Sequence, residues 1–198
     1  SRLSAEGKSA VAMIGFSLFM APFVYWILFR GQADVLTKLG FRDVSDDAVR
    51  AWVAGLLLAA AYVAYCVRIP SVRLWLVRVH PLKLLALILA VLAGTLEEIF
   101  FRKIVMDWME RLGGDTAVQV AVSSVSFGLM HAVWGGLRGS WTTAIGSVVA
   151  TTLLGLGLAI VYLLGGRNLA PCIVSHFLVT ALIEPGLVIA AFGGRMRA

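Results

Sequence analysis

Uncharged stretches long enough to cross a membrane alternate along the chain with short charged segments. The first stretch, residues 9–29, contains 21 residues without a charged side chain. At about 1.5 Å per residue, a helix of that length crosses a hydrocarbon core about 30 Å thick. The pattern predicts an all-α integral membrane bundle of about six transmembrane helices, at residues 9–29, 51–67, about 82–111, 116–137, within 139–166, and 168–194.

Turn and capping residues mark several of these boundaries. Ser45 precedes two aspartates, which is typical of a helix start with acidic residues in its first turn. Gly113-Gly114 is expected to end the third span, and Asp115 is a candidate N-cap of the fourth. Glu184-Pro185-Gly186 is expected to interrupt the sixth span, with Glu184 at a membrane–water boundary and without a catalytic role.

A basic connector joins the second and third predicted spans. Its cations recur every five residues, so on a helix they would wind around the axis instead of forming one face. This spacing favours an interfacial linker with snorkelling side chains over an amphipathic surface helix. The four cations are Arg68, Arg73, Arg78 and Lys83.

Composition supports the membrane assignment. Hydrophobic residues make up 60% of the 198 residues and charged residues 14%, and the mean hydropathy is +0.91. Soluble domains average about 45–50% apolar and about 25% charged residues. A chain of this length is sufficient for one compact bundle, so we expect a single transmembrane domain over residues 1–198.

The net charge of +6 does not indicate a nucleic-acid-binding protein. The seventeen Lys and Arg residues are scattered through the short segments between apolar runs, where anionic lipid headgroups lie. Cys66 and Cys172 each lie inside an apolar run without metal-binding spacing, and are expected to be buried and unpaired.

Ionisable residues interrupt the third apolar run, where they are costly and usually mark a functional pathway. Residues 84–96 carry no charge, and Glu97 and Glu98 follow directly. On a helix Glu98 and Arg102 are i,i+4 neighbours and can pair. Glu97 points about 100° away and has no partner within its own helix.

Two further spans each carry a polar stripe. Residues spaced by four drift only about 40° per step, so each set stays on one helix face. If the third, fourth and sixth spans pack together, Glu97, Glu98, His131 and His176 meet in one buried site. The stripes are Gln119, Ser123, Phe127 and His131 in the fourth span, and Asn168, Cys172, His176, Thr180 and Glu184 in the sixth.

Two carboxylates and two histidines fit two kinds of hydrolytic chemistry. In one, Glu97 is a general base that takes a proton from water, His131 positions that water, and His176 donates to the oxyanion. In the other, the four residues bind a divalent metal such as zinc, although the chain has no HExxH motif. The alternative is a purely structural role for these residues. Glu98 and Arg102 would then form an ion pair that only stabilises a helix end, and the histidines would only form hydrogen bonds between helices.

These residues resemble the motifs of the CPBP family, the CAAX proteases and bacteriocin-processing enzymes, also called the Abi family of glutamic intramembrane proteases. The family's first motif matches Glu97-Glu98-Ile-Phe-Phe-Arg102, and its second matches Phe127-Gly-Leu-Met-His131. The third region is similar to Asn168-Leu-Ala-Pro-Cys-Ile-Val-Ser-His176, and Lys38-Leu-Gly-Phe-Arg42 resembles an early signature. The resemblance covers about residues 38–184.

One position departs from the family pattern. The family usually has asparagine or aspartate four residues after the third-motif histidine, where this chain has Thr180. Asn168 lies two turns before His176 and is not a simple replacement. A threonine hydroxyl still donates one hydrogen bond, but it lacks the reach of an amide.

The resemblance implies an intramembrane endopeptidase that needs no cofactor. It implies Glu97 as general base, Glu98 as a supporting carboxylate held by Arg102, His131 as the residue that orients the water, and His176 with Thr180 at the oxyanion. Expected partners are the lipid bilayer and a membrane-associated or C-terminally anchored peptide or protein. The expected location is the bacterial cytoplasmic membrane. A metal-dependent protease and a non-proteolytic membrane immunity or partner protein remain open alternatives.

Overall fold

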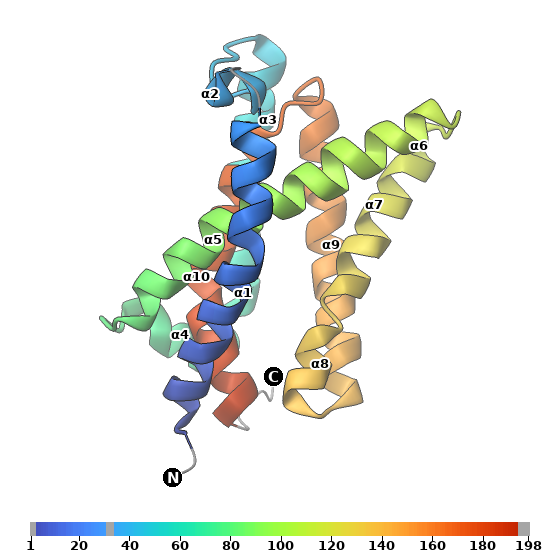
Figure 1. Ribbon diagram of the computed structural model, residues 1–198. Helices are drawn as coiled ribbons and strands as arrows, with labels where there is room; N and C mark the ends of the chain where they lie inside the picture. The colour runs from blue at the N-terminus through green and yellow to red at the C-terminus, as the bar shows by residue number, and fades with distance from the viewer. Residues whose placement is uncertain (1–2, 31–33, 194–198) are drawn as a thin grey trace.

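The computed structural model describes residues 3–30 and 34–193, and this part of the chain is helical without a β-strand. Six of its helices are long and apolar enough to cross a membrane, which confirms the predicted number of spans. Figure 1 shows the bundle. The elements are α1 (Ala5–Phe29), α2 (Val35–Lys38), α3 (Asp46–Cys66), α4 (Pro70–Val77), α5 (Leu82–Glu98), η1 (Ile99–Met106), α6 (Asp107–Arg111), α7 (Thr116–Met130), α8 (Val133–Arg138), α9 (Trp141–Leu164) and α10 (Ala170–Gly193).

Side-chain caps set two of the predicted helix starts. The Ser45 hydroxyl accepts a hydrogen bond from the Ala48 N–H at 3.2 Å, and α3 begins at the next residue. The Asp115 carboxylate accepts one from the Val118 N–H at 2.9 Å at the start of α7. Each cap satisfies a backbone donor that has no partner within the helix.

The third span is one long tilted element whose winding changes at the predicted catalytic residues. Helix α5 ends at Glu98, and η1 continues without a break as a π-helix that contains Arg102. With α6, these segments form a 30-residue span, Leu82–Arg111. Short π-helical turns inside α-helices are frequently found at functional sites.

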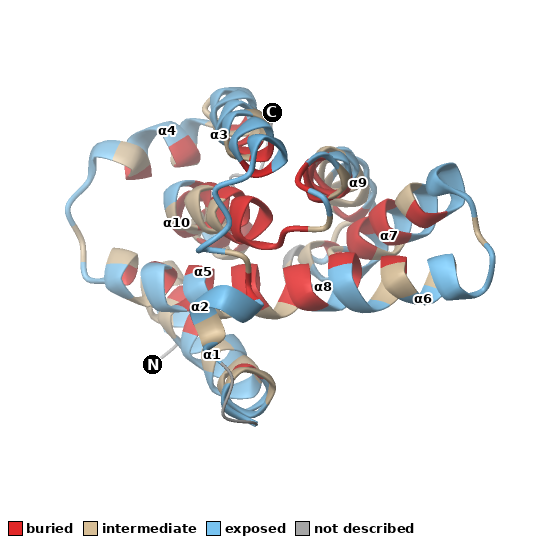
Figure 2. Ribbon diagram, turned by 90° about the horizontal axis from the view of Figure 1, so that it is seen from above, coloured by how far each residue is buried: buried red, intermediate tan, exposed pale blue. Residues whose placement is uncertain are grey.

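Helix α10 lies at the centre of the bundle and contacts α1, α3, α4, α5 and α9. Helices α7 and α9 pack closely against each other beside it. Figure 2 shows buried residues on the facing sides of α9 and α10, whereas α1 lies at the edge and is mostly exposed. An 18-residue window of α1 is only 11% buried, as expected for a helix that faces lipid.

Two local expectations from the sequence are wrong. The basic connector contains the short helix α4, in which Val72 and Trp75 are buried. Helix α10 runs through Pro185 without interruption, and Gly186 allows α4 to approach: a Cβ there would lie 2.5 Å from the Val72 Cα. The fourth span covers Thr116–Leu137 as predicted, with α8 continuing it after the end of α7 at Met130. Residue 194, the end of the predicted sixth span, lies outside the described residues.

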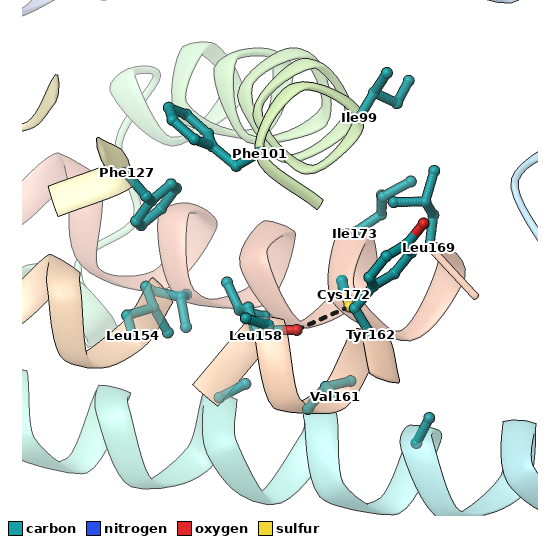
Figure 3. Close-up of a cluster of buried hydrophobic side chains, with 14 of the residues drawn as sticks. Ile99, Phe101, Phe127, Leu154, Leu158, Val161, Tyr162, Leu169, Cys172 and Ile173 are labelled. Carbon is teal, nitrogen blue, oxygen red and sulfur yellow. Dashed lines mark hydrogen bonds between the residues drawn. The ribbon is translucent and has the colours of Figure 1, made fainter. Parts of the chain in front are cut away.

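A buried apolar cluster joins η1, α7, α9 and α10 (Figure 3). The Phe101 and Phe127 rings meet edge to face, with centroids 5.3 Å apart. Across the cluster, the Cys172 thiol donates to the Leu158 carbonyl at 3.4 Å. Cys66 and Cys172 are both free and buried, as predicted. This cluster forms one wall of the polar site.

Candidate active site

Glu98 connects two other elements of the bundle through its carboxylate. Its Oε2 lies 3.0 Å from Arg102 Nε, and both side chains are 0% exposed. Its Oε1 lies 2.8 Å from His176 Nδ1 on α10. Because the Arg102 N–H is not aimed at Oε2, that contact is an ion pair and not a directed hydrogen bond. A buried charge needs such partners, since removal from water costs several kcal/mol per ion.

Arg102 reaches beyond its own element to α7 and α9. An Nη donates to the Gly155 carbonyl at 3.3 Å, and the guanidinium lies 4.6 Å from the centroid of the Phe127 ring. The planar, delocalised guanidinium suits an ion pair on one edge and an aromatic ring on its face. Gly155 also lets α7 lie close to α9 at this point, because a Cβ there would lie 3.0 Å from Phe127 Cδ1.

Glu97 points away from this ion pair toward both predicted histidines. Its Oε2 lies 4.0 Å from His131 Nε2 and 4.0 Å from His176 Nε2. The Glu97 side chain is 10% exposed, and Oε2 has no hydrogen-bond partner in the described part of the chain. A water molecule with hydrogen bonds of about 2.8 Å fits between groups at such separations.

The backbone of α7 orients the His131 ring. His131 follows the last residue of that helix, and its Nδ1 lies 2.8 Å from the Phe127 carbonyl. A carbonyl only accepts hydrogen bonds, so Nδ1 carries the proton in this contact. In the neutral imidazole Nε2 is then an acceptor, and it faces Glu97. The contact therefore selects a tautomer whose Nε2 accepts a hydrogen bond from water.

The predicted residues open into a common cavity of about 310 Å³ between α1, α5, α8 and α10. Thr180 lies one turn after His176 on α10 and lines this cavity. Glu98 and Arg102 lie behind the cavity wall. The polar lining is Glu97, His131, His176, Thr180 and Glu184, and the apolar lining is Phe16, Phe19, Met20, Leu89, Ala93, Met130, Val133, Trp134 and Leu137.

The two ends of the polar stripe in the sixth span, Glu184 and Asn168, differ in their surroundings. Glu184, expected at a membrane–water boundary, lines the cavity. Asn168 caps α10 by accepting from the Ala170 N–H, and its amide donates to the Gly40 carbonyl and to Asp43. The pKa of Asp43 lies below its usual value because of hydrogen bonds from the Ser45 backbone and hydroxyl, with a smaller contribution from Asn168. Asn168 thus connects the segment that contains Gly40 and Asp43 to the start of α10.

Sequence reasoning missed the Gly155 carbonyl that binds Arg102 and the Trp134 side chain that lines the cavity. Neither carries a local signal, because a carbonyl is present at every residue and tryptophan is common at membrane interfaces. Among the described residues, no three His, Cys, Asp or Glu side chains are grouped as metal ligands.

Comparison with known families gives a match that covers more than half of the chain. The profile of the type II CAAX prenyl endopeptidase Rce1-like family matches residues 79–182, which include both glutamates, both site histidines and Thr180. Searches of the curated proteins and of the solved structures gave no significant match. The chain is therefore an integral membrane protein that belongs to the Rce1-like family of CAAX-type membrane proteases.

Proposed function

We propose that the chain is an intramembrane endopeptidase in which Glu97 activates the water that attacks the peptide bond. The observation that carries this proposal is the Glu97 carboxylate. Its Oε2 lies 4.0 Å from each of two histidine Nε2 atoms and accepts no hydrogen bond from any residue that the structure describes. A carboxylate in a membrane-embedded cavity is costly and usually marks a functional site, which favours a catalytic role for Glu97. Localisation to a bacterial cytoplasmic membrane is part of the proposal.

The proposed reaction begins with a water molecule held between Glu97 and His131. Glu97 removes a proton as the water oxygen attacks the substrate carbonyl carbon, and a tetrahedral oxyanion forms. His176 and Thr180 donate hydrogen bonds to that oxyanion. When the C–N bond breaks, the proton passes from Glu97 to the leaving nitrogen, which gives an acid and an amine and restores the carboxylate.

Glu98 and Arg102 have positioning roles in this scheme. With Nδ1 of His176 directed at Glu98 at 2.8 Å, the other ring nitrogen faces the cavity and Glu97. Because Nδ1 donates to Glu98, Nε2 carries an N–H for the oxyanion only in the imidazolium form, whose charge the Glu98 carboxylate neutralises. Arg102 holds Glu98 in place and limits the negative charge so close to Glu97.

The proposed substrates are membrane-associated or C-terminally anchored peptides and proteins. The family match makes prenylated C-terminal CAAX peptides the first class to test. The cavity fits such a substrate because its walls are largely apolar whereas its polar groups gather along α5, α7 and α10.

The test compares purified wild type with Glu97→Gln, which keeps the size of the side chain but removes the base. Both are incubated with a farnesylated CAAX peptide, the same peptide without the prenyl group and an unrelated membrane-anchored peptide. Each assay is run with and without a strong chelator, and products are read by mass spectrometry. Wild-type cleavage that is indifferent to chelator and lost in Glu97→Gln supports the proposal.

The other outcomes separate the alternatives. Cleavage lost to chelator and restored by zinc would identify a metal-dependent protease. Retained cleavage by Glu97→Gln would overturn the role of Glu97. Absence of cleavage across the panel would favour a non-proteolytic membrane partner or immunity protein, for which Glu97→Gln should still function.

A further inference from the structure

Glu184 is a third acidic residue in the active-site cavity, and the proposed hydrolysis does not use it. It lines the cavity together with Glu97, His176 and Thr180. It is half-buried and makes no ion pair or hydrogen bond with any side chain that the structure describes. Evidence that this cavity receives a ligand comes from Glu97. Its buried Oε2 also has no hydrogen-bond partner among the described residues.

The polar groups of α10 that line the cavity follow one another along the helix. His176, Thr180 and Glu184 are spaced by four residues, and the helix between them is unbroken. At about 1.5 Å of rise per residue, Glu184 lies about 12 Å along the helix axis from His176. An extended peptide advances about 3.3 Å per residue, so this distance corresponds to three or four residues.

We propose that Glu184 forms a subsite for a cationic side chain of the substrate, three or four residues from the peptide bond that is cleaved. The inference rests on the proposed function, because the scissile bond is taken to lie at Glu97 and His176. The chemistry recognised is a lysine or arginine side chain within an otherwise apolar segment.

The surroundings of Glu184 favour a cation over other ligands. Most residues that line the cavity are apolar, so an ionised carboxylate there is stabilised chiefly by a counter-charge. The other ionisable side chains that line the cavity are Glu97, His131 and His176. Glu97 adds negative charge, whereas the two histidines serve the proposed reaction. A substrate ammonium or guanidinium therefore supplies the charge that the cavity lacks.

The same charge distribution sets the direction of a CAAX substrate. Only three residues follow the cysteine of such a sequence, and the last one carries the terminal carboxylate. That carboxylate is repelled by Glu184. The C-terminal end of the substrate therefore lies away from Glu184. The cationic residue that Glu184 binds then lies on the N-terminal side of the cleaved bond.

The experiment moves one lysine along a substrate. The probe is a farnesylated CAAX peptide with alanine, serine and leucine upstream of the cysteine, in which a single lysine occupies each upstream position in turn. Matched peptides carry norleucine, which keeps the aliphatic chain without the charge. In wild type, kcat/KM for lysine is expected to exceed that for norleucine about tenfold at one or two adjacent positions, three or four residues upstream.

Two variants identify Glu184 as the cause. Glu184→Gln should remove the lysine preference and leave kcat/KM for the norleucine peptides unchanged within about twofold. Glu184→Lys should reverse the preference in favour of a peptide with glutamate at that position. Glu6→Gln is the matched control, because Glu6 lies on α1 outside the cavity and contacts Arg78. A uniform profile along the peptide in wild type would overturn the inference without any variant.

A binding measurement separates this inference from the proposed function. Affinities of the lysine and norleucine peptides are compared in Glu97→Gln and in Glu97→Gln combined with Glu184→Gln. Tighter lysine binding of about tenfold that vanishes in the double variant supports the subsite even if no peptide is cleaved. Equal affinities would overturn the subsite, whereas wild-type cleavage would still support the endopeptidase.

Discussion

Glu98 and His176 are 78 residues apart in the chain, and their side chains meet at 2.8 Å between Oε1 and Nδ1. The other oxygen of Glu98 lies 3.0 Å from Arg102. The three side chains therefore connect α5, η1 and α10 through charged groups that have little access to water. Such a connection fixes the orientation of His176, but Arg102 and His176 both depend on the Glu98 carboxylate as their partner.

Removal of Arg102 should destabilise the protein as well as inactivate it. Arg102→Leu leaves the Glu98 carboxylate buried without its cation, which typically costs about 3–5 kcal/mol. Arg102→Lys keeps the charge but loses the planar contact with Phe127 and the bond to the Gly155 carbonyl, so a smaller loss is expected. Thermal unfolding in detergent, followed by a fluorescence scan, measures both changes.

The double variant Glu98→Gln with Arg102→Leu is the control for the charge argument. It removes both charges, and should be more stable than Arg102→Leu alone. Equal stability of the single and double variants would show that packing, and not the unpaired carboxylate, determines the loss. Activity should remain low in both, since the positioning of His176 is lost.

Substitution of His131 should affect catalysis far more than folding. His131→Gln removes the ring nitrogen that faces Glu97 but retains a polar side chain of similar reach. Because misplacement of a reacting group by about 1 Å can cost about 10²-fold, we expect at least that loss in kcat. His80, in the turn between α4 and α5, is the matched control. Comparable losses in His80→Gln and His131→Gln would contradict a site-specific role.

Thr180 tests the departure from the family pattern. Thr180→Val keeps the shape of the side chain and removes its hydroxyl, and kcat should fall by about 10²-fold if that hydroxyl donates to the oxyanion. Thr180→Asn supplies the donor that the family usually has, and should match or exceed wild type. Single-turnover rates separate this effect from substrate binding. A Thr180→Val enzyme with wild-type kcat would place the oxyanion donors elsewhere.

The sequence allowed prediction of the spans and of which polar residues meet, because both follow from long-range regularities. Uncharged runs identify the helices, and steps of four identify the faces that carry Glu97, His131 and His176. The predicted convergence is seen in the Glu98–His176 contact and in the two 4.0 Å separations at Glu97. The catalytic roles of these residues, the absence of a cofactor and the domain bounds stay predictions.

Other features depend on the rotation of each helix about its axis and on the angles at which helices cross. The hydrophobic and polar pattern of a single sequence does not specify these. The π-helix after Glu98 has no distinctive residue, and packing against α7 accompanies it. Glu184 precedes a proline, which usually ends or kinks a helix, yet α10 continues and carries Glu184 into the cavity. The basic connector folds as α4, and Gly186 leaves room for the Val72 backbone to pack against α10.

Asp43 should make a pH-dependent contribution to stability at one end of the bundle. Hydrogen bonds hold its pKa below the usual value in the folded protein. The contribution is therefore present above the unfolded pKa of about 4 and is lost as the pH falls through the lower folded value. The melting temperature of wild type should exceed that of Asp43→Ala near pH 6, and the two should converge on acidification. A difference independent of pH would refute this origin.

Glycine-to-alanine substitutions should destabilise the protein where two helices are in close contact, but not where the glycine has open space beside it. A Cβ on Gly128 would collide with the Thr152 hydroxyl and lie 2.8 Å from the Val148 carbonyl oxygen. Gly128→Ala should therefore force α7 and α9 apart and lower the free energy of unfolding by about 1–3 kcal/mol. Because His131 follows one turn later, activity should fall as well.

Gly146→Ala is the matched control on α9, since a Cβ there meets nothing within 4 Å. Alanine favours a helix over glycine by up to about 1 kcal/mol, so this variant should be as stable as wild type or slightly more stable. Unfolding in a denaturing detergent, titrated for all three proteins, gives the comparison. Similar losses in both variants would mean that glycine acts through the helix backbone, and not through the α7–α9 contact that positions His131.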